Sequence, residues 1–199
     1  MIILLCGGIG SGKSTVAEYL TTNFFFEEVS FADPLKKFAL ALGFEFSDVY
    51  GSQEEKCKVN DFWGISGRQF MQRCGTDIIR KHSHILGENI DNLWIKAMEC
   101  KILKAQRECR NLVISDGRFE DEIELGRKYG GIVIKLKRST GSGAYDLGSS
   151  IDSSIHESEK NFDKIQEDFL YENNKSKEEL FSFIKQVVEK NKKINVFLK

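Results

Sequence analysis

The stretch from Cys6 to Thr15, CGGIGSGKST, constrains the fold of this chain more than any other feature. It has the spacing G-x-x-x-x-G-K-[ST], with Gly7, Gly12 and Lys13 at defining positions. Glycines permit backbone angles that let successive N–H groups point inward at phosphate oxygens. An apolar run, Met1 to Leu5, precedes the loop, and apolar residues at helical spacing follow it. The sequence therefore predicts a strand, a phosphate-binding loop (P-loop) and a helix.

Side chains of the P-loop add chemistry to its backbone. We expect Lys13 to reach the β and γ phosphates of a bound triphosphate. Ser14 opens the helix and can place its hydroxyl on Mg²⁺, while the helix N-terminus adds partial positive charge. The residues expected to bind the triphosphate are Gly8, Gly10, Ser11, Gly12, Lys13, Ser14 and Thr15.

Bulk composition excludes several classes of protein. The 199 residues suit one domain, or one with inserted subdomains, and 29 basic against 30 acidic residues argue against a broad nucleic-acid surface. The five cysteines form no C-x-x-C pair, which predicts reduced thiols, most of them buried. No run approaches the roughly 20 apolar residues of a membrane span. We therefore expect a soluble cytoplasmic protein, in the host cytoplasm if it is viral, with no membrane or nucleic-acid partner.

An aspartate follows the expected second strand, which the pattern places at 28–31. Asp33 precedes Pro34, a residue that suits the first turn of a helix. In open α/β sheets ligands gather at the carboxyl ends of strands, so Asp33 can face the P-loop. One interpretation is a plain helix cap; the other is an acid that orients or deprotonates an acceptor, or helps to hold Mg²⁺.

The region 43–64 lacks a clear period and predicts an irregular or short-helical insertion. A helix then follows, from a cap at Ser66 to about Lys81. Arg73, Asp77 and Arg80 have the i, i+4, i+7 spacing of one helical face, with Gln72 close by. They are either a solvated face containing an ion pair or an arginine fork for a second phosphate group.

The next helix is expected over 91–107 and carries Trp94. Trp94 is either a core residue or an aromatic cover for a base. A third strand is expected at 111–115, and Asp116 follows it. This is the arrangement of a Walker B carboxylate, which contacts Mg²⁺ directly or through water. Arg118 follows at a helix start, where a cation is electrostatically unfavourable, and this favours a role on transferring phosphate.

A fourth strand is expected at 132–136, followed by Arg138 and a serine- and glycine-rich stretch. This composition predicts a mobile lid over 138–156 that excludes water from the nucleotide. The last strand is expected at 169–171 and the last helix at 177–190.

Four motifs together resemble the bacteriophage-type deoxynucleoside monophosphate kinases, of the P-loop nucleoside monophosphate kinase superfamily. The resemblance runs from Met1 to about Val188 and depends on the order of the motifs. They are Ser30 to Lys36, Gly67 to Arg80 with Trp94 downstream, Ile114 to Phe119 with Glu122, and His156 to Glu159.

The resemblance implies an α/β fold with three αβα layers, a parallel five-stranded sheet, a helical acceptor-binding insertion and a lid. The core would comprise 1–42, 110–137 and 166–190, the acceptor region 43–109 and the lid 138–156. It implies transfer of the ATP γ-phosphoryl group to a deoxynucleoside monophosphate (dNMP), with Mg²⁺. Acceptor roles fall on Asp33, Arg68, Gln72, Arg80 and Trp94; catalytic roles fall on Lys13, Arg118, Arg138 and Asp33; Ser14 and Asp116 would hold the metal.

Three alternatives stay open at this point. The stretch GGIGSGKSTVAEYL, residues 7–20, is also similar to dephospho-CoA kinases, and two motifs are shared with animal phosphomevalonate kinases. A P-loop switch or binding module with little turnover is the third, but a GTPase is disfavoured because Asn174-Lys175-Ser176 is followed by Lys177 rather than aspartate. Base preference, sugar discrimination and oligomeric state are left open, a homodimer being one option.

Overall fold

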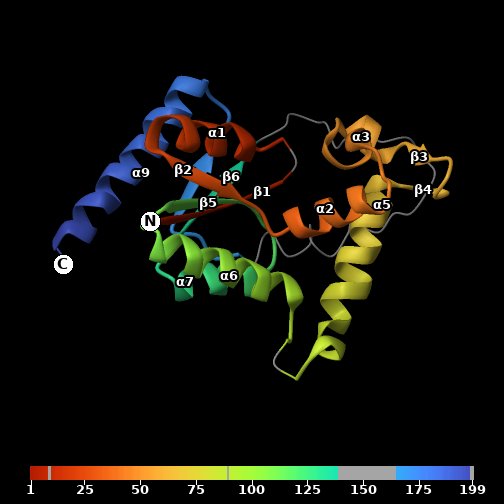
Figure 1. Cartoon of the computed structure of the whole chain (residues 1–199). Helices are drawn as coiled ribbons and strands as arrows, with labels where there is room; N and C mark the ends of the chain where they lie inside the picture. Colours follow the sequence, from red (N-terminus) through yellow and green to blue (C-terminus); the bar gives the residue numbers. More distant parts are fainter. Residues whose placement is uncertain (9, 89, 139–164, 198–199) are drawn as a thin grey trace. The chain divides into compact units, whose positions relative to one another are not determined.

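The computed structural model describes residues 1–8, 10–88, 90–138 and 165–197 (Figure 1). It contains two compact units. The first, which we call the sheet unit, comprises Met1–Val29 and Lys104–Lys199. The second, the helical unit, comprises Ser30–Leu103.

The sheet unit is built on five parallel strands in the order β2-β5-β1-β6-β7. The central strand β1 is almost entirely buried, as expected for an apolar strand covered on both faces. This confirms the predicted five-stranded parallel sheet. The strands are β1 (Ile2–Gly7), β2 (Phe26–Val29), β5 (Asn111–Gly117), β6 (Ile132–Lys137) and β7 (Phe169–Glu172).

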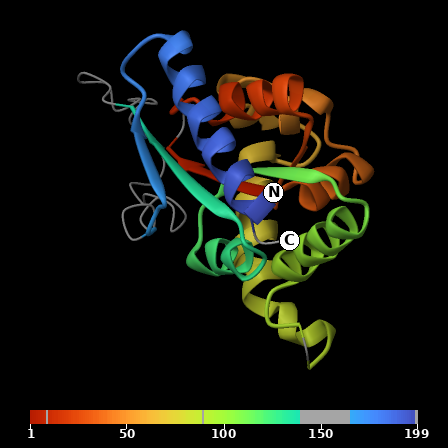
Figure 2. The same cartoon turned by 90° about the vertical axis from the view of Figure 1, so that its left-hand side faces the viewer.

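Helices cover both faces of this sheet. Figure 1 shows α1 (Lys13–Phe24) and α9 (Lys177–Phe197) on one face and α7 (Glu120–Lys128) on the other. Figure 2 shows α9 running beside β6 and β7, where Tyr171 stacks on Phe183 with ring centroids 4.7 Å apart. The main core lies between the sheet, α1 and α9, and it includes Leu5, Val16, Leu20, Ile134, Leu180 and Ile184. The three-layer αβα prediction is confirmed.

The second strand and the last helix have boundaries that differ from the sequence-based expectation. The second strand ends at Val29, because Phe26 to Val29 pair with β5 and the chain then turns into the next helix. The last helix continues past Lys190 to Phe197, where no glycine or proline interrupts it.

The helical unit consists of short elements around a small core of Ala39, Phe44 and Val49. The expected insertion contains two short helices and a two-stranded hairpin. Ser66 caps the next helix as predicted, since its hydroxyl accepts a hydrogen bond from the Gln69 N–H at 3.2 Å. The elements are α2 (Asp33–Ala41), α3 (Phe46–Tyr50), α4 (Gln53–Cys57), β3 (Val59–Asn60), β4 (Ile65–Ser66), α5 (Gly67–Gln72), the π-helix η1 (Arg73–Arg80), the 3₁₀-helix η2 (Ser83–Leu86) and α6 (Leu93–Arg107), which continues beyond this unit.

The π-helix corrects the predicted arginine face. Its i→i+5 hydrogen bonds change the angle between successive residues, so the i, i+4, i+7 spacing no longer marks one α-helical face. Asp77 forms its ion pair with Lys81, at 3.0 Å, rather than with Arg73. Arg73 is exposed, whereas Arg80 is half-buried. The two arginines therefore have different environments.

The five cysteines are all free thiols, as predicted, but only Cys6 is buried. The expectation that most would be buried was wrong, because Cys100 occupies an exposed position of α6, Cys109 lies in the turn after it, and Cys57 and Cys74 are half-buried. Among the described residues, no helix combines the length and the apolar character that crossing a membrane requires.

Candidate active site

The P-loop joins the end of β1 to the first turn of α1. Gly12 caps α1 with φ 102° and Gly10 has φ 75°, two left-handed angles that favour glycine. A Cβ at Gly7 would lie 2.6 Å from the Leu136 carbonyl oxygen, so this glycine permits close approach of β6. The loop conformation therefore depends on the glycines that the motif predicted.

Lys13 is held inside the loop by backbone carbonyls. Its Nζ donates to the Gly7 oxygen at 2.7 Å and to the Gly8 oxygen at 2.8 Å. Burial and the nearby positive charge of Arg118 lower the pKa of Lys13 to about 8. The negative charge of Asp116 opposes this shift. Lys13, Asp116 and Arg118, all predicted as site residues, therefore lie in one electrostatic environment.

A buried carboxylate shapes the turn that carries Arg118. Glu122, only 3% exposed, accepts hydrogen bonds from the backbone N–H groups of Arg118 at 2.8 Å and Phe119 at 3.2 Å. These two hydrogen bonds satisfy N–H groups at the start of α7, whose first turn is acidic. Arg118 is exposed. Asp116 is half-buried and is the second-last residue of β5, rather than lying after the strand.

Arg138 follows β6 and also contacts the P-loop. Its Nη1 donates to the Gly10 carbonyl oxygen at 3.4 Å, a long hydrogen bond. The remainder of the expected lid and the motif at 156–159 lie outside the described residues.

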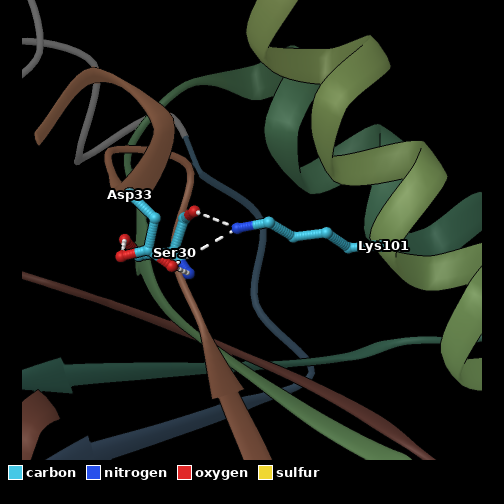
Figure 3. A network of polar contacts seen from close by, with 3 residues as sticks. All are labelled: Ser30, Asp33 and Lys101. Carbon is cyan, nitrogen blue, oxygen red and sulfur yellow. Dashed lines mark hydrogen bonds and ion pairs between the residues drawn. The ribbon is translucent and has the colours of Figure 1, made fainter. Parts of the chain in front are cut away.

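In the helical unit, Asp33 belongs to a small polar network (Figure 3). Its Oδ1 accepts from the Ser30 hydroxyl at 2.7 Å, and its Oδ2 accepts from the Ser30 N–H at 3.1 Å and Lys101 Nζ at 3.3 Å. Burial raises the pKa of Asp33, but these hydrogen bonds and the charge of Lys101 outweigh it and hold that pKa below its usual value. Asp33 is therefore a carboxylate at neutral pH. Lys101 was missed by the sequence reasoning, since nothing in its local pattern points to a residue so distant in the chain.

A second group of cations was only partly predicted. Lys36 Nζ lies 4.9 Å from the centre of the Tyr50 ring, and Arg68 Nη1 donates to Gln53 Oε1 at 3.1 Å. Burial and the charges of Lys36 and Arg68 lower the pKa of Lys56, which lies one turn after Gln53 in α4. We call these three residues the Lys36–Lys56–Arg68 cluster. Only Arg68 was assigned a site role from the sequence, because α2, α4 and α5 had to pack before the other two could be placed.

Trp94 lies in the interior of the helical unit. It is 8% exposed, and its Nε1 donates to the Gly75 carbonyl oxygen in the π-helix at 2.9 Å. This favours the core interpretation over a cover for a base. Gln72 and Arg80, at the two ends of this π-helical segment, are both half-buried.

A P-loop with its lysine, on a parallel five-stranded sheet whose strand β5 carries an aspartate near its end, is typical of P-loop phosphotransferases. The family model described as deoxynucleotide monophosphate kinase matches residues 43–184. A provisionally assigned deoxynucleotide monophosphate kinase of Acanthamoeba polyphaga mimivirus is 36% identical over 208 residues, covering 98% of this chain and all of that protein. The chain belongs to the deoxynucleotide monophosphate kinase family. It is an ATP-dependent nucleotide kinase.

Two solved structures are similar at lower identity. Dephospho-CoA kinase from Campylobacter jejuni is 16% identical, with a TM-score of 0.47 and 98% of each chain covered. Shikimate kinase from Aquifex aeolicus is 15% identical, with a TM-score of 0.47 and coverage of 96% of this chain and 98% of that one.

Proposed function

We propose that this kinase transfers the γ-phosphoryl group of ATP to the 5′-monophosphate of a deoxynucleoside, giving dNDP and ADP. The observation that carries the proposal is the Lys36–Lys56–Arg68 cluster, a concentration of positive charge in the helical unit in addition to Lys13 in the sheet unit. Like charges held together cost free energy, which a bound phosphate group would recover. A monophosphate acceptor provides such a group.

On the donor side, the P-loop amides and Lys13 bind the ATP phosphates. Arg118 and Arg138 neutralise charge on the transferring group. Ser14 and Asp116 would hold Mg²⁺, since a hydroxyl and a carboxylate are the oxygen ligands this ion prefers. Bound there, the ion would neutralise phosphate charge. No cluster of three or more His, Cys, Asp or Glu suited to a metal occurs in the described ranges, but Mg²⁺ sites of this kind take their other ligands from water and substrate phosphates.

On the acceptor side, Arg68 with Lys36 and Lys56 binds the monophosphate, assisted by Gln72 at the end of α5 and Arg80 at the end of the π-helix. The acceptor oxygen of a monophosphate is already ionised, so transfer needs no strong base. A hydroxyl acceptor would instead benefit from a base with a pKa near the working pH. Because the Asp33 pKa lies below its ordinary value, Asp33 is a weak base that suits orienting an acceptor or a metal. This favours a phosphate acceptor over a hydroxyl acceptor.

A coupled assay of ADP formation across dNMPs, NMPs, dephospho-CoA and phosphomevalonate tests this assignment. We expect turnover with at least one dNMP at a higher kcat/KM than with the ribonucleotide of the same base. Turnover with dephospho-CoA or phosphomevalonate alone would replace the assignment. No turnover with any of the acceptors would leave a nucleotide-binding module.

A matched pair of lysines in α2 tests the acceptor cluster. Lys36 is half-buried beside Tyr50, whereas the adjacent Lys37 is exposed. We expect Lys36→Ala to raise the KM for dNMP about tenfold, the cost of one charge-assisted hydrogen bond, and to leave the KM for ATP within about twofold. Lys37→Ala should change neither constant. Equal effects of the two substitutions would remove Lys36 from the acceptor site.

A further inference from the structure

The turn after β7 contacts the P-loop through one side chain, that of Asn173. Its Nδ2 donates to the Ser11 carbonyl oxygen at 2.9 Å, across 162 residues of sequence. A Cβ added at Gly12 would lie 2.4 Å from the same Nδ2. The carboxamide of Asn173 therefore packs directly against the peptide that joins Ser11 to Gly12.

Both partners of this hydrogen bond are firmly placed. Ser11 is 2% exposed, and its own N–H donates to the Gly8 oxygen at 3.3 Å. The Asn173 N–H donates to the Lys137 oxygen at 2.6 Å, which continues the pairing of β6 with β7. A carbonyl oxygen can only accept, so the amide group of Asn173 must present its NH₂ to Ser11.

The hydrogen bond sets the direction of one P-loop amide. In a planar trans peptide the C=O and the N–H point in opposite directions. By holding the Ser11 C=O, Asn173 fixes the orientation of the Gly12 N–H, which belongs to the phosphate-binding motif. The same contact restrains Gly12 at φ 102°, an angle that also starts α1.

We propose that Asn173 is a positioning residue of the ATP site, which preorganises the Ser11–Gly12 peptide for phosphate binding. The proposal rests on ATP binding at the P-loop and not on the identity of the acceptor. Preorganised donors gain affinity because the loop does not have to be ordered when the ligand binds. The loss of Asn173 should therefore weaken ATP binding more than it slows transfer from bound ATP.

Calorimetric titration of ATP without any acceptor tests the proposal independently of the reaction. We expect Asn173→Ala to raise the Kd for ATP about fivefold, as for loss of one neutral hydrogen bond. Asn173→Asp, which places a carboxylate against a carbonyl oxygen and near the phosphates, should raise it by more than about tenfold. The adjacent, exposed Asn174 provides the control, and Asn174→Ala should leave the Kd within about twofold.

Steady-state kinetics separate positioning from general damage. Asn173→Ala should raise the KM for ATP while kcat and the KM for dNMP stay within about twofold. An unchanged Kd for ATP in Asn173→Ala would overturn the proposal. A wrong acceptor assignment would leave the calorimetric result intact, so failure of the two proposals can be distinguished.

A double-mutant cycle with Gly12→Ala tests the contact itself. The nearest atom outside Asn173 to an added Cβ, Leu180 Cδ2, is 3.8 Å away, so the close contact is with Asn173. Gly12→Ala should weaken ATP binding less in the Asn173→Ala background than in the wild type, although the strain at φ 102° remains in both. Equal losses in the two backgrounds would contradict the proposed contact, and this comparison stands even if Asn173→Asp fails to fold.

Discussion

The P-loop in the sheet unit and the Lys36–Lys56–Arg68 cluster in the helical unit concentrate positive charge in different ways. The P-loop uses one continuous stretch, in which glycines shape the backbone and Lys13 donates to carbonyls of its own loop. The cluster takes one residue from each of three helices; Tyr50 contacts Lys36 and Gln53 accepts a hydrogen bond from Arg68. A contiguous motif thus indicates a binding site from the sequence alone, whereas residues from separate helices come together only after those helices have packed.

The largest expected effect is a loss of ATP use, with binding of dNMP left intact. Lys13→Ala removes the charge that we propose to contact the ATP phosphates, so we expect kcat/KM for ATP to fall about 100-fold or more. The affinity for dNMP, measured by equilibrium binding, should change by less than about twofold. Lys185→Ala, at an exposed position on α9, is the control. ADP formation at the wild-type rate in Lys13→Ala would remove the P-loop from catalysis.

The next prediction tests whether the proposed acceptor site includes Arg80. Arg80 is half-buried and Arg73 exposed, although both belong to the same π-helix. We expect Arg80→Ala to raise the KM for dNMP about tenfold or more, with the KM for ATP nearly unchanged. Arg73→Ala should alter neither by more than about twofold. The opposite pattern would return Arg80 to the role of a solvated surface residue.

A pH profile sharpens the description of the donor side. Because the pKa of Lys13 is about 8, this side chain loses its proton above that pH in the free protein. We expect kcat/KM for ATP to be constant below pH 8 and to fall up to tenfold per pH unit above it. In kcat the decline should come at higher pH, since bound phosphates raise the Lys13 pKa. Arg118→Gln should move the decline in kcat/KM upward, because it removes a nearby positive charge.

The same shift has a consequence for stability that needs no substrate. Between pH 8 and the ordinary value of 10.5, the folded protein holds fewer protons at Lys13 than the unfolded chain. The free energy of unfolding of the wild type should therefore rise with pH in this window, relative to Lys13→Met. A flat difference between the two proteins in denaturant titrations would show that Lys13 keeps its ordinary pKa.

The smallest effect concerns the Asp33 network. Lys101 and Asp33 are each about one-third exposed, so we expect Lys101→Met to cost less than about 1 kcal/mol at pH 7. The folded pKa of Asp33 lies below its ordinary 3.8, so its contribution is present above that pH and disappears as the pH falls through the folded value. Denaturant titration at pH 7 and pH 3 measures the loss. Lys104→Met, at an exposed position of the same helix, should show neither effect.

Much of the sheet unit could be predicted from the sequence. Its central strand β1 is a short apolar run, and Lys13 donates to carbonyls of its own loop, so local pattern and local structure agree there. The helical unit was predictable only in outline. Helices α3 and α4 have only five residues each, too few for a repeating apolar pattern. The 3.6-residue period assumed for Arg73 to Arg80 fails in a π-helix.

The sequence by itself determined that a phosphate-binding loop follows the first strand, because the angles at Gly10 and Gly12 and the position of Lys13 depend on residue types at fixed spacing. Tertiary structure decided which distant side chains complete the sites. Lys101 reaches Asp33 across 68 residues and Asn173 reaches Ser11 across 162. Such contacts are created by packing, and no property of either residue's neighbours in the chain encodes them.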